Sequence, residues 1–428
     1  MGEDGAVLGP HGDVLDRAVT DVAQATGDDR IAAMVERSMR ENLDAVTEVL
    51  DDGTCFVLTG DIPAMWLRDS TAQVRPYLML AAEDDQLADT LVGMLRRQLA
   101  FIALDPYANA LKRGSEPSWH ADDQTELRPE VWERKYEIDS LCFPIELAAQ
   151  LHALGRSEVV DDQLRHVAGL IIDLWERERD HASSTYSFQR LDAPLSDTLT
   201  QHGRGEPVGW TGMTWAGFRP SDDACRYNYN IPGNMFAHRA LGHLRRLLDG
   251  QGLSERAAAL QQSIAHGIEE YGTVLHEKHG TVYAYEVDGL GGQLLMDDAN
   301  MPSLLSAPLT GYLAVDDPTY LATRALILSA ENPYYFEGRY ARGIGSPHTP
   351  DRYVWPISLA VQGLTSTSRE EQLDLLRLLR DTTAGTGQMH EAFDVDDPAD
   401  YTRPWFSWAN AMFCELALTV AGRSLPRL

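Results

Sequence analysis

Apolar residues recur along much of this chain at the spacing of one buried helical face. The clearest run steps by four, three, four and three residues through Val160, Leu164, Val167, Ile171 and Leu174. That period, with charged residues between the apolar ones, predicts an amphipathic helix. The segment 368–380 predicts another helix, because Ser368 and Glu371 form a capping box ahead of a leucine-lined face.

Similar patterns predict roughly ten to twelve helices over the whole length and very few strands. The further helical ranges are 28–50, 84–104, 133–154, 234–249, 253–271, 316–330, 351–364 and 404–421. Strand signals are confined to 55–58 and 281–287, which we expect to form small hairpins on a helical body.

The organisation of the 428 residues points to one main domain. No Pro- or Ser-rich linker divides the chain, and its longest loops are rich in aromatic and charged residues: 106–132, 190–222, 332–350 and 382–403. Long structured loops are usually functional. We therefore expect an N-terminal extension with a first helix over 1–27, and a single all-α domain over 28–428 whose loops build one site. Periodicity does not distinguish a ring of paired helices from a solenoid.

Composition and charge exclude several kinds of partner. Apolar residues make up 44% of the chain, enough for a large core, and 36 basic against 65 acidic residues leave a net charge of −29. That charge repels phosphate backbones and anionic lipids, so we expect no nucleic acid and no membrane partner. The acidity itself is typical of a solvated surface. The chain begins with no export signal and has no apolar window long enough to span a membrane, so cytoplasm is the expected location.

No pattern for metal or cofactor binding is present in the sequence. Thirteen histidines lack ligand spacing, and there is no H-E-x-x-H, P-loop, strand-borne G-x-G-x-x-G or G-x-S-x-G motif. We predict no metal and no cofactor. The four cysteines, Cys55, Cys142, Cys225 and Cys414, are far apart and are expected to be buried free thiols.

The loops do contain carboxylates beside Arg, Asn and aromatic residues. These clusters are 60–69, 219–223, 297–300 and 389–391. Arg and Asp can bracket sugar hydroxyls while an indole covers the apolar face of the ring. Cleavage of a glycosidic bond needs two carboxyl groups, one protonated and one ionised. The clusters therefore favour a carbohydrate-active enzyme.

Each cluster also has a structural interpretation. Arg68 and Asp69 could be an exposed ion pair, but their place between Trp66 and an apolar helix start favours function. Asp222 and Asp223 fit a helix N-cap equally well. Glu391 alone is more typical of a solvated loop acid.

Taken in order, these loops resemble glycoside hydrolase family 125, the metal-independent exo-α-1,6-mannosidases. The similarity is carried by seven segments: Phe56 to Gln73, Trp132 to Leu141, Thr211 to Trp215, Phe218 to Asp223, Tyr285 to Gly291, Ser346 to Thr349 and Gly387 to Glu391. It departs from the family pattern at Asn230, where an apolar residue is expected, and at Gly233, where Ser is frequent.

The resemblance implies an (α/α)6 barrel and an inverting mechanism. It places Asp222 at the general acid and Glu391 at the general base, with Asp223 as the alternative acid. Asp222 would then need a pKa raised by burial or by Asp223 in order to keep its proton. Glu391 would be ionised and about 6.5–9.5 Å from the acid, leaving space for a water.

By analogy with glucoamylase-type hydrolases, Trp66, Arg68 and Asp69 are expected to hold the terminal sugar and make the enzyme exo-acting. Weaker candidates for lining the pocket are Glu137, Asp139, Asn234 and His348. The expected partner is an α-mannoside oligosaccharide or N-glycan fragment. The alternatives are another (α/α)6 exo-glycosidase of glucoamylase type and a sugar-binding relative that has lost catalysis. A helical-repeat interaction protein is disfavoured, because the sequence has no internal repeat.

Overall fold

Helices of two kinds alternate along the chain. The structure is a computed structural model that describes residues 12–114, 118–248 and 252–428. One kind buries a single face: α2 (Asp29–Val46), α5 (Asp85–Leu104), α7 (Asp162–Arg177), α10 (Gly252–Tyr271), α11 (Pro318–Ile327) and α13 (Arg369–Asp381). These form the outer layer. A further helix, α1 (Gly12–Thr26), precedes them.

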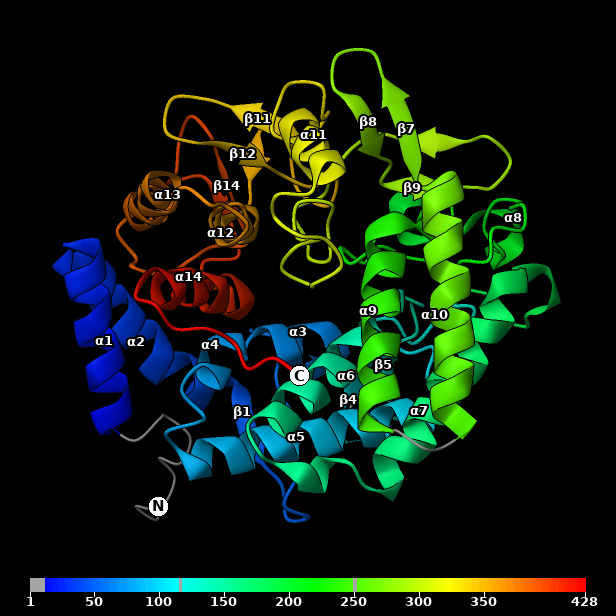
Figure 1. The fold of residues 1–428 in the computed structure, drawn as a ribbon, viewed down its shortest axis with the longest axis horizontal. Coiled ribbons are helices and arrows are strands. Elements are labelled where there is room, and N and C mark those ends of the chain that lie inside the picture. The colour runs from blue at the N-terminus through cyan, green and yellow to red at the C-terminus, as the bar shows by residue number, and fades with distance from the viewer. Residues whose placement is uncertain (1–11, 115–117, 249–251) are drawn as a thin grey trace.

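The second kind is buried almost all round. It comprises α3 (Leu67–Ala72) with α4 (Arg75–Leu78), α6 (Ile138–Ala153), α9 (Ile231–Leu247), α12 (Pro356–Leu364) and α14 (Ser407–Val420). The turns of residues 301–314 take the place of a sixth inner helix between α10 and α11. Helices without a polar face belong inside a protein, and Figure 1 shows α3, α6, α9, α12 and α14 nearer the middle of the molecule than their outer partners. The predicted (α/α)6 barrel is thereby confirmed.

Short antiparallel sheets decorate the loops. The two-stranded ones are β1–β2 (Thr47–Val49, Cys55–Val57), β7–β8 (Thr273–His276, Gly280–Tyr283) and β11–β12 (Tyr335–Glu337, Arg342–Ile344). The three-stranded ones are β3–β4–β5 (Ala64–Trp66, Ala110–Lys112, Val131–Glu133), β10–β9–β6 (Gln293–Leu294, Glu286–Val287, Tyr229–Asn230) and β13–β14–β15 (Tyr353–Val354, Ala392–Asp394, Tyr401–Thr402). The loops also contain the short helix α8 (Thr200–Gly203) and 3-10 turns at Ser157–Val159, Glu178–Ser183 and Leu195–Asp197.

Most predicted helices are present, but several of their ends were wrong. The range 133–154 begins too early, because Val131–Glu133 is strand β5, and the range 351–364 includes strand β13. Each of these strands pairs with a segment remote in sequence, which a local pattern cannot reveal. The predicted strand 281–287 is two strands that pair with different partners. Position 249 lies outside the described residues.

Capping explains several helix starts. Asp28, Asp84 and Asp161 each accept a hydrogen bond from the first turn of an outer helix. Ser368 accepts from the Glu371 N–H as predicted, but the Glu371 carboxylate instead accepts from Arg324 and neighbouring side chains, so the box is half formed.

The two departures from the family pattern form one cap. Asn230 is the N-cap of α9, and its Oδ1 accepts from the Gly233 N–H at 2.8 Å. A Cβ on residue 233 would lie 2.9 Å from that oxygen. Gly233 therefore leaves the room that the asparagine cap needs.

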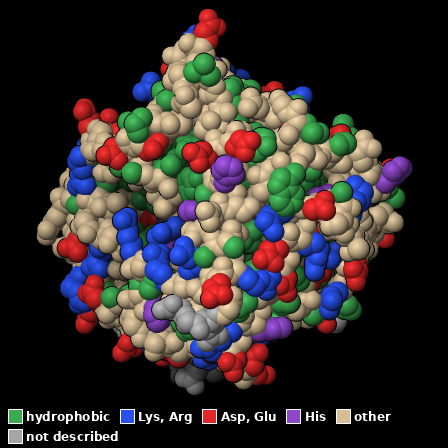
Figure 2. Space-filling view, turned by 45° about the vertical axis from the view of Figure 1, so that its right-hand side comes forward, with side chains coloured by type: hydrophobic (Ala, Val, Ile, Leu, Met, Phe, Trp, Pro, Cys, Tyr) green, Lys and Arg blue, Asp and Glu red, His purple; other side chains and the backbone are tan. Residues whose placement is uncertain are grey.

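Other expectations concern the surface and the thiols. All four cysteines are buried and free, as predicted. Figure 2 shows acidic side chains scattered over one face and not gathered in a single patch. No helix among the described residues is long and apolar enough to cross a membrane.

The large hydrophobic core contains residues from Val14 to Val420, and a buried ion pair joins two inner helices beside it. Arg75 of α4 donates to Glu415 of α14 through Nε at 2.7 Å and through a second nitrogen at 2.8 Å. Both side chains are 1% exposed. Removing Glu415 would deprive the buried Arg75 of its nearest carboxylate partner and leave it with Glu146 at 3.6 Å.

Glu415→Ala is therefore expected to lower the free energy of unfolding by about 3–5 kcal/mol. Chemical denaturation monitored by circular dichroism measures this loss. Asp374→Ala, which removes an exposed partner of Arg377, is the control and should cost less than about 1 kcal/mol. Equal costs for the two variants would contradict the assignment of Arg75–Glu415 as a structural pair.

Candidate active site

The N-terminal ends of the inner helices meet at one end of the barrel. Arg68 is the second residue of α3, and Asp139 is the second residue of α6. The β3–β4–β5 sheet brings these two helix starts together, because β3 leads directly into α3 and β5 ends four residues before Glu137. Residues that are about seventy positions apart in sequence thereby become neighbours.

Arg68 is surrounded by carboxylates. Its Nη1 donates to Glu137 at 2.7 Å and to Asp139 at 3.1 Å, and its Nη2 donates to Asp222 at 3.0 Å. Its Nε lies 3.5 Å from Asp69. The Arg68 side chain is only 3% exposed, so the structure confines these charges in the protein interior.

One guanidinium contacts four carboxylates, so burial of this cluster favours protonation of some of them. Burial raises the pKa of Asp69 to about 6, although Arg68 opposes the change. Burial also raises the pKa of Asp139, and it raises the pKa of Glu137 well above its usual range. Burial in this cluster thus favours the protonated forms of Asp69, Asp139 and Glu137.

Asp222 differs from these neighbours. Burial alone would raise its pKa, but contact with Arg68 and a hydrogen bond with Glu137 outweigh burial and lower the pKa well below its usual range. The expectation of a raised pKa at Asp222 is therefore wrong for the free protein. The cause is the opposite charge of Arg68, whereas Asp223, the neighbour considered in sequence, is not a principal contributor.

Asp222 is held in an unusual backbone conformation. Its φ is +64°, in the left-handed region that few residues other than glycine adopt. The ammonium of Lys135 donates to the Asp222 carbonyl at 2.8 Å, and Asn109 Nδ2 lies 3.3 Å from the Asp222 carboxylate. Lys135 is fixed in turn by an ion pair with Asp197. These contacts aim a carboxylate that is still 24% exposed.

Asp223 points away from this cluster toward His348. Its Oδ1 lies 3.2 Å from His348 Nδ1, and its Oδ2 is buried without a hydrogen-bond partner. Burial alone would lower the pKa of His348, but the hydrogen bond to Asp223 raises it to about 9. The hydrogen bond to Asp223 thus favours the protonated form of His348.

Glu391 lies immediately before strand β14 and is 11% exposed. Its Oε1 is 3.5 Å from the guanidinium of Arg403, which also contributes to the electrostatics of Asp69. The charge of Glu391 likewise acts on His348. The loop of Glu391 is therefore coupled to Asp69 through Arg403, and to Asp223 through His348. Its predicted separation of about 6.5–9.5 Å from Asp222 stays a prediction.

Two predicted residues have other contacts. Trp66 is 6% exposed and packs with Trp132 and Ala110 in a small apolar cluster. Asn234 is completely buried, and its amide bonds the backbone of Thr214 and Asn230. Asn234 therefore fixes the start of α9 and does not line a pocket.

Sequence reasoning missed three residues of the site: Asn109, Lys135 and Arg403. Asn109 connects Asp222 to Glu133, and it accepts from the Lys135 backbone N–H. Arg403 contacts Glu391 and stacks over Phe406. Lys135 lies inside a segment that carried the family resemblance, which was the available signal for it.

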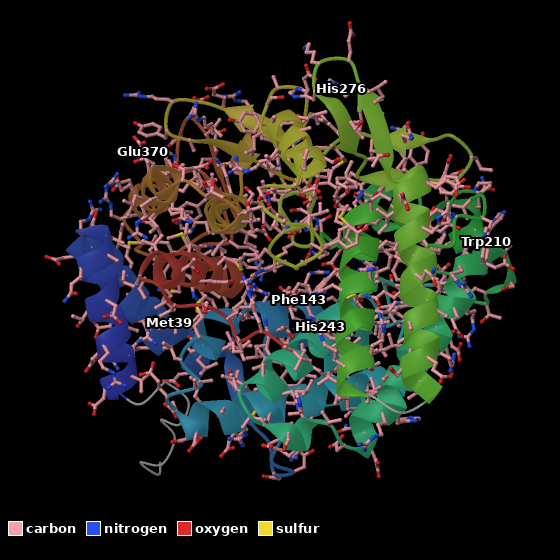
Figure 3. All side chains as sticks on the ribbon, in the orientation of Figure 1. Met39, Phe143, Trp210, His243, His276 and Glu370 are labelled. Atoms are coloured by element: carbon pink, nitrogen blue, oxygen red, sulfur yellow. The ribbon has the colours of Figure 1, made fainter. Side chains whose placement is uncertain are left out.

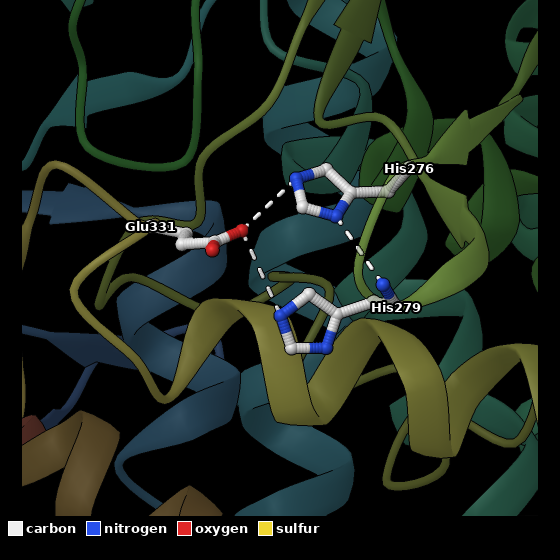
Figure 4. Close-up of side chains that lie close together, drawn as sticks. All are labelled: His276, His279 and Glu331. Carbon is white, nitrogen blue, oxygen red and sulfur yellow. Dashed lines mark hydrogen bonds and ion pairs between the residues drawn. The ribbon is translucent and has the colours of Figure 1, made fainter.

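One cluster away from this site resembles a metal site. His276 and His279 of the β7–β8 hairpin face Glu331, the only such group among the described residues (Figure 4). The spacing His276-x-x-His279 was the missed signal. His276 Nδ1 accepts from the N–H groups of Lys278 and His279, so the ring proton lies on Nε2, 2.9 Å from Glu331. A cation bound there would have to displace that proton. The three side chains therefore connect the β7–β8 hairpin to the loop of Glu331.

The opposite end of the inner helices encloses a cavity of about 510 Å³. It is lined by Met79, Gln150, His243, Leu364, Thr419 and Arg423, which lie at or beyond helix C-terminal ends. Figure 3 shows His243 and Phe143 in the middle of the molecule, whereas Trp210, His276 and Glu370 lie at its periphery. The carboxylate cluster is therefore at the other end of the barrel from this cavity.

Residues 28–418 match the sequence family of metal-independent α-mannosidases, glycoside hydrolase family 125. The chain belongs to this family. It is 46% identical to a metal-independent α-mannosidase of Streptococcus pneumoniae, whose structure was solved in a non-productive complex with α-1,6-mannobiose. That match covers 97% of this chain and 100% of the other, with a TM-score of 0.94. This member of family 125 is thus a glycoside hydrolase.

Two further similarities extend the comparison. The family 125 chain is 38% identical over 440 residues to the meiotically up-regulated gene 157 protein of Schizosaccharomyces pombe, covering 96% of this chain and 86% of the yeast protein. A bacterial glucoamylase solved with acarbose has a TM-score of 0.58 at 13% identity, over 93% of this chain and 56% of that one. The glucoamylase shows the shared fold alone.

The ion pair of His348 with Asp223 should make the stability of this family 125 enzyme depend on pH. Folding raises the pKa of His348 from 6.5 to about 9, so the stabilisation is complete below about pH 6.5 and is lost as the pH rises through about 9. The melting temperatures of the wild type and His348→Gln, measured between about pH 6 and pH 10, test this. The difference between them should shrink at alkaline pH, and a difference that stays constant would contradict it.

Proposed function

We propose that this enzyme is an inverting exo-α-1,6-mannosidase. It releases the non-reducing terminal mannose of α-mannosides, with Asp222 as the general acid and Glu391 as the general base. The full-length similarity to the S. pneumoniae enzyme, solved with α-1,6-mannobiose, supports the sugar and the linkage. N-glycan fragments, the substrates implied by the resemblance, are the expected larger substrates.

The placement of Asp222 supports its role as the acid. Its carboxylate is the most exposed of those that contact Arg68, and the contacts to Lys135 and Asn109 hold it in one orientation. A general acid needs a fixed carboxyl group that reaches the departing oxygen and that can obtain a proton. Asp223 is less suitable, because His348 engages one of its oxygens and the other is buried.

Glu391 has surroundings suited to a base. It lies 3.5 Å from the cation of Arg403. An ionised carboxylate there can accept a proton from a water that attacks the anomeric carbon on the face opposite the departing oxygen. The product of that attack is β-mannose.

The residues around Arg68 support the exo mode. Asp69 is 5% exposed and lies beside Arg68 and within the influence of Arg403. Hydroxyls of a terminal sugar can exchange hydrogen bonds with these groups. Helices α3 and α6 begin at these groups and are buried almost all round, so the proposal places the terminal sugar against the helix starts.

The proposal predicts the anomer that forms first from α-1,6-mannobiose. Proton NMR during hydrolysis should show β-mannose appearing before mutarotation, because the water attacks opposite the leaving group. First-formed α-mannose would mean retention and would remove Glu391 from its role as base. Release of glucose from maltose without release of mannose would instead favour the glucoamylase-type alternative.

Variants provide the controls for this experiment. Asp222→Asn and Glu391→Gln should each lower kcat on α-1,6-mannobiose by about 100-fold or more. Asp374→Asn, on the exposed face of α13, should retain wild-type kcat. Unchanged turnover in both site variants would contradict the assigned roles.

A further inference from the structure

Glu137 is the most deeply buried of the carboxylates around Arg68. It directly precedes α6, its side chain is 0% exposed, and it makes no cap bond to that helix. Its Oε2 accepts from Arg68 at 2.7 Å and from Ser140 at 2.8 Å. Its Oε1 is buried and has no N–H or O–H donor.

Arg68 donates to both Glu137 and Asp222 and so brings the two carboxyl groups together, and a hydrogen bond between the two side chains contributes to the pKa of each. Two ionised carboxylates repel each other at this range, so a hydrogen bond between them requires a proton. A protonated Glu137 that donates to Asp222 satisfies the buried oxygen and removes one excess negative charge. Arg68 donates to Glu137 through Nη1 and to Asp222 through Nη2, which fixes the positions of the two carboxyl groups relative to each other.

We infer that Glu137 is the proton partner of Asp222: the two carboxyl groups share one proton, which passes from Glu137 through Asp222 to the departing oxygen. The inference rests on the proposed function, in which Asp222 is the acid. Because the side chain of Glu137 is fully buried and that of Asp222 is 24% exposed, the shared proton reaches a substrate only through Asp222.

The step is balanced. Glu137 gives its proton to Asp222, and Asp222 gives a proton to the glycosidic oxygen as the bond to the anomeric carbon breaks. Glu391 takes a proton from the attacking water, whose oxygen forms the new bond. The pair is then one proton short and Glu391 holds one extra, and exchange with solvent restores both.

The groups that face the pair favour one retained proton. Arg68 is the cation in contact with both carboxyl groups, and Asp69 and Asp139 add negative charge from α3 and α6. Lys135 donates to the Asp222 carbonyl, and Asn109 donates to the Asp222 carboxylate. The positive charge of His348 also acts on Asp222. Accordingly, burial and then the charge of Asp222 raise the pKa of Glu137, although Arg68 opposes them.

Glu137→Gln tests the inference. Glutamine can donate to Asp222 and accept from Arg68, but it carries no proton to transfer. Asp222 then keeps a pKa lowered by Arg68, so its acid form is lost at lower pH. We expect kcat on α-1,6-mannobiose to fall about 100-fold, with KM little changed and the alkaline limb of the pH profile moved to lower pH.

The choice of substrate separates proton supply from sugar binding. With 2,4-dinitrophenyl α-mannoside, whose leaving group needs no acid, the same variant should remain within about tenfold of wild type. Glu178→Gln changes another buried carboxylate, which bonds Tyr107 and His181, and should leave both the substrate dependence and the alkaline limb as in wild type. Equal losses on both substrates, with a raised KM and an unmoved limb, would overturn the inference, as would unchanged activity.

Asp222→Asn, assayed with the same two substrates, separates this inference from the proposed function. One outcome is that Asp222→Asn loses activity on mannobiose and keeps it on the dinitrophenyl substrate while Glu137→Gln does neither. In that case the proposed function stands, and the inference that Glu137 is the proton partner of Asp222 is wrong. If Asp222→Asn retains activity on mannobiose, the function itself fails.

A second measurement does not require the glutamine variant to fold. Infrared spectra of protein labelled with ¹³C-glutamate should contain a protonated glutamate band at neutral pH that shifts in Asp222→Asn. The band should shift because the protonated Glu137 would then donate to a neutral amide in place of a carboxylate. A wild-type spectrum without this band would contradict the shared proton.

Discussion

The guanidinium of Arg68 lies in the protein interior among the carboxylates of Asp69, Glu137, Asp139 and Asp222. Removing that many charges from water would be unfavourable unless the cation and retained protons reduced their repulsion. Arg68 therefore does two things at once. It brings together residues from α3, α6 and the loop before α9, and its charge opposes the rise in pKa that burial produces at each carboxyl group. The low pKa of Asp222 and the high pKa of Glu137 are two consequences of this one arrangement.

The barrel makes such a cluster possible. Its inner helices are buried on nearly all sides. Polar side chains at their N-terminal ends are therefore found where loop residues bond to them or where they form the site. Short antiparallel sheets set the loop positions, as when β3–β4–β5 places Arg68 beside Glu137. Lys135 then fixes the left-handed backbone of Asp222 from the loop side. The geometry of the candidate site is thus a property of the contacts between loops and helix starts.

Sequence patterns revealed part of this arrangement. Helical periods located most of the helices, and the segment around Arg68 and Asp69 was informative because polar residues there precede an apolar helix. Asp222 and Glu391 were singled out only through the family resemblance. The roles of Asn109 and Lys135 could not be predicted, since their partners are remote in sequence. For the same reason the pKa direction of Asp222 was wrong: Arg68, which lowers it, lies 154 positions away. Strands β5 and β13 were missed because their pairing is also tertiary.

The most direct test of this account is a crystal structure of Asp222→Asn with α-1,6-mannobiose bound productively. The account predicts the glycosidic oxygen within hydrogen-bonding distance of residue 222, and the hydroxyls of the terminal mannose at Arg68 and Asp69. It also predicts a water between Glu391 and the anomeric carbon, on the face opposite the leaving sugar. A mannobiose bound with its glycosidic oxygen away from residue 222, or with no room for a water at Glu391, would contradict it.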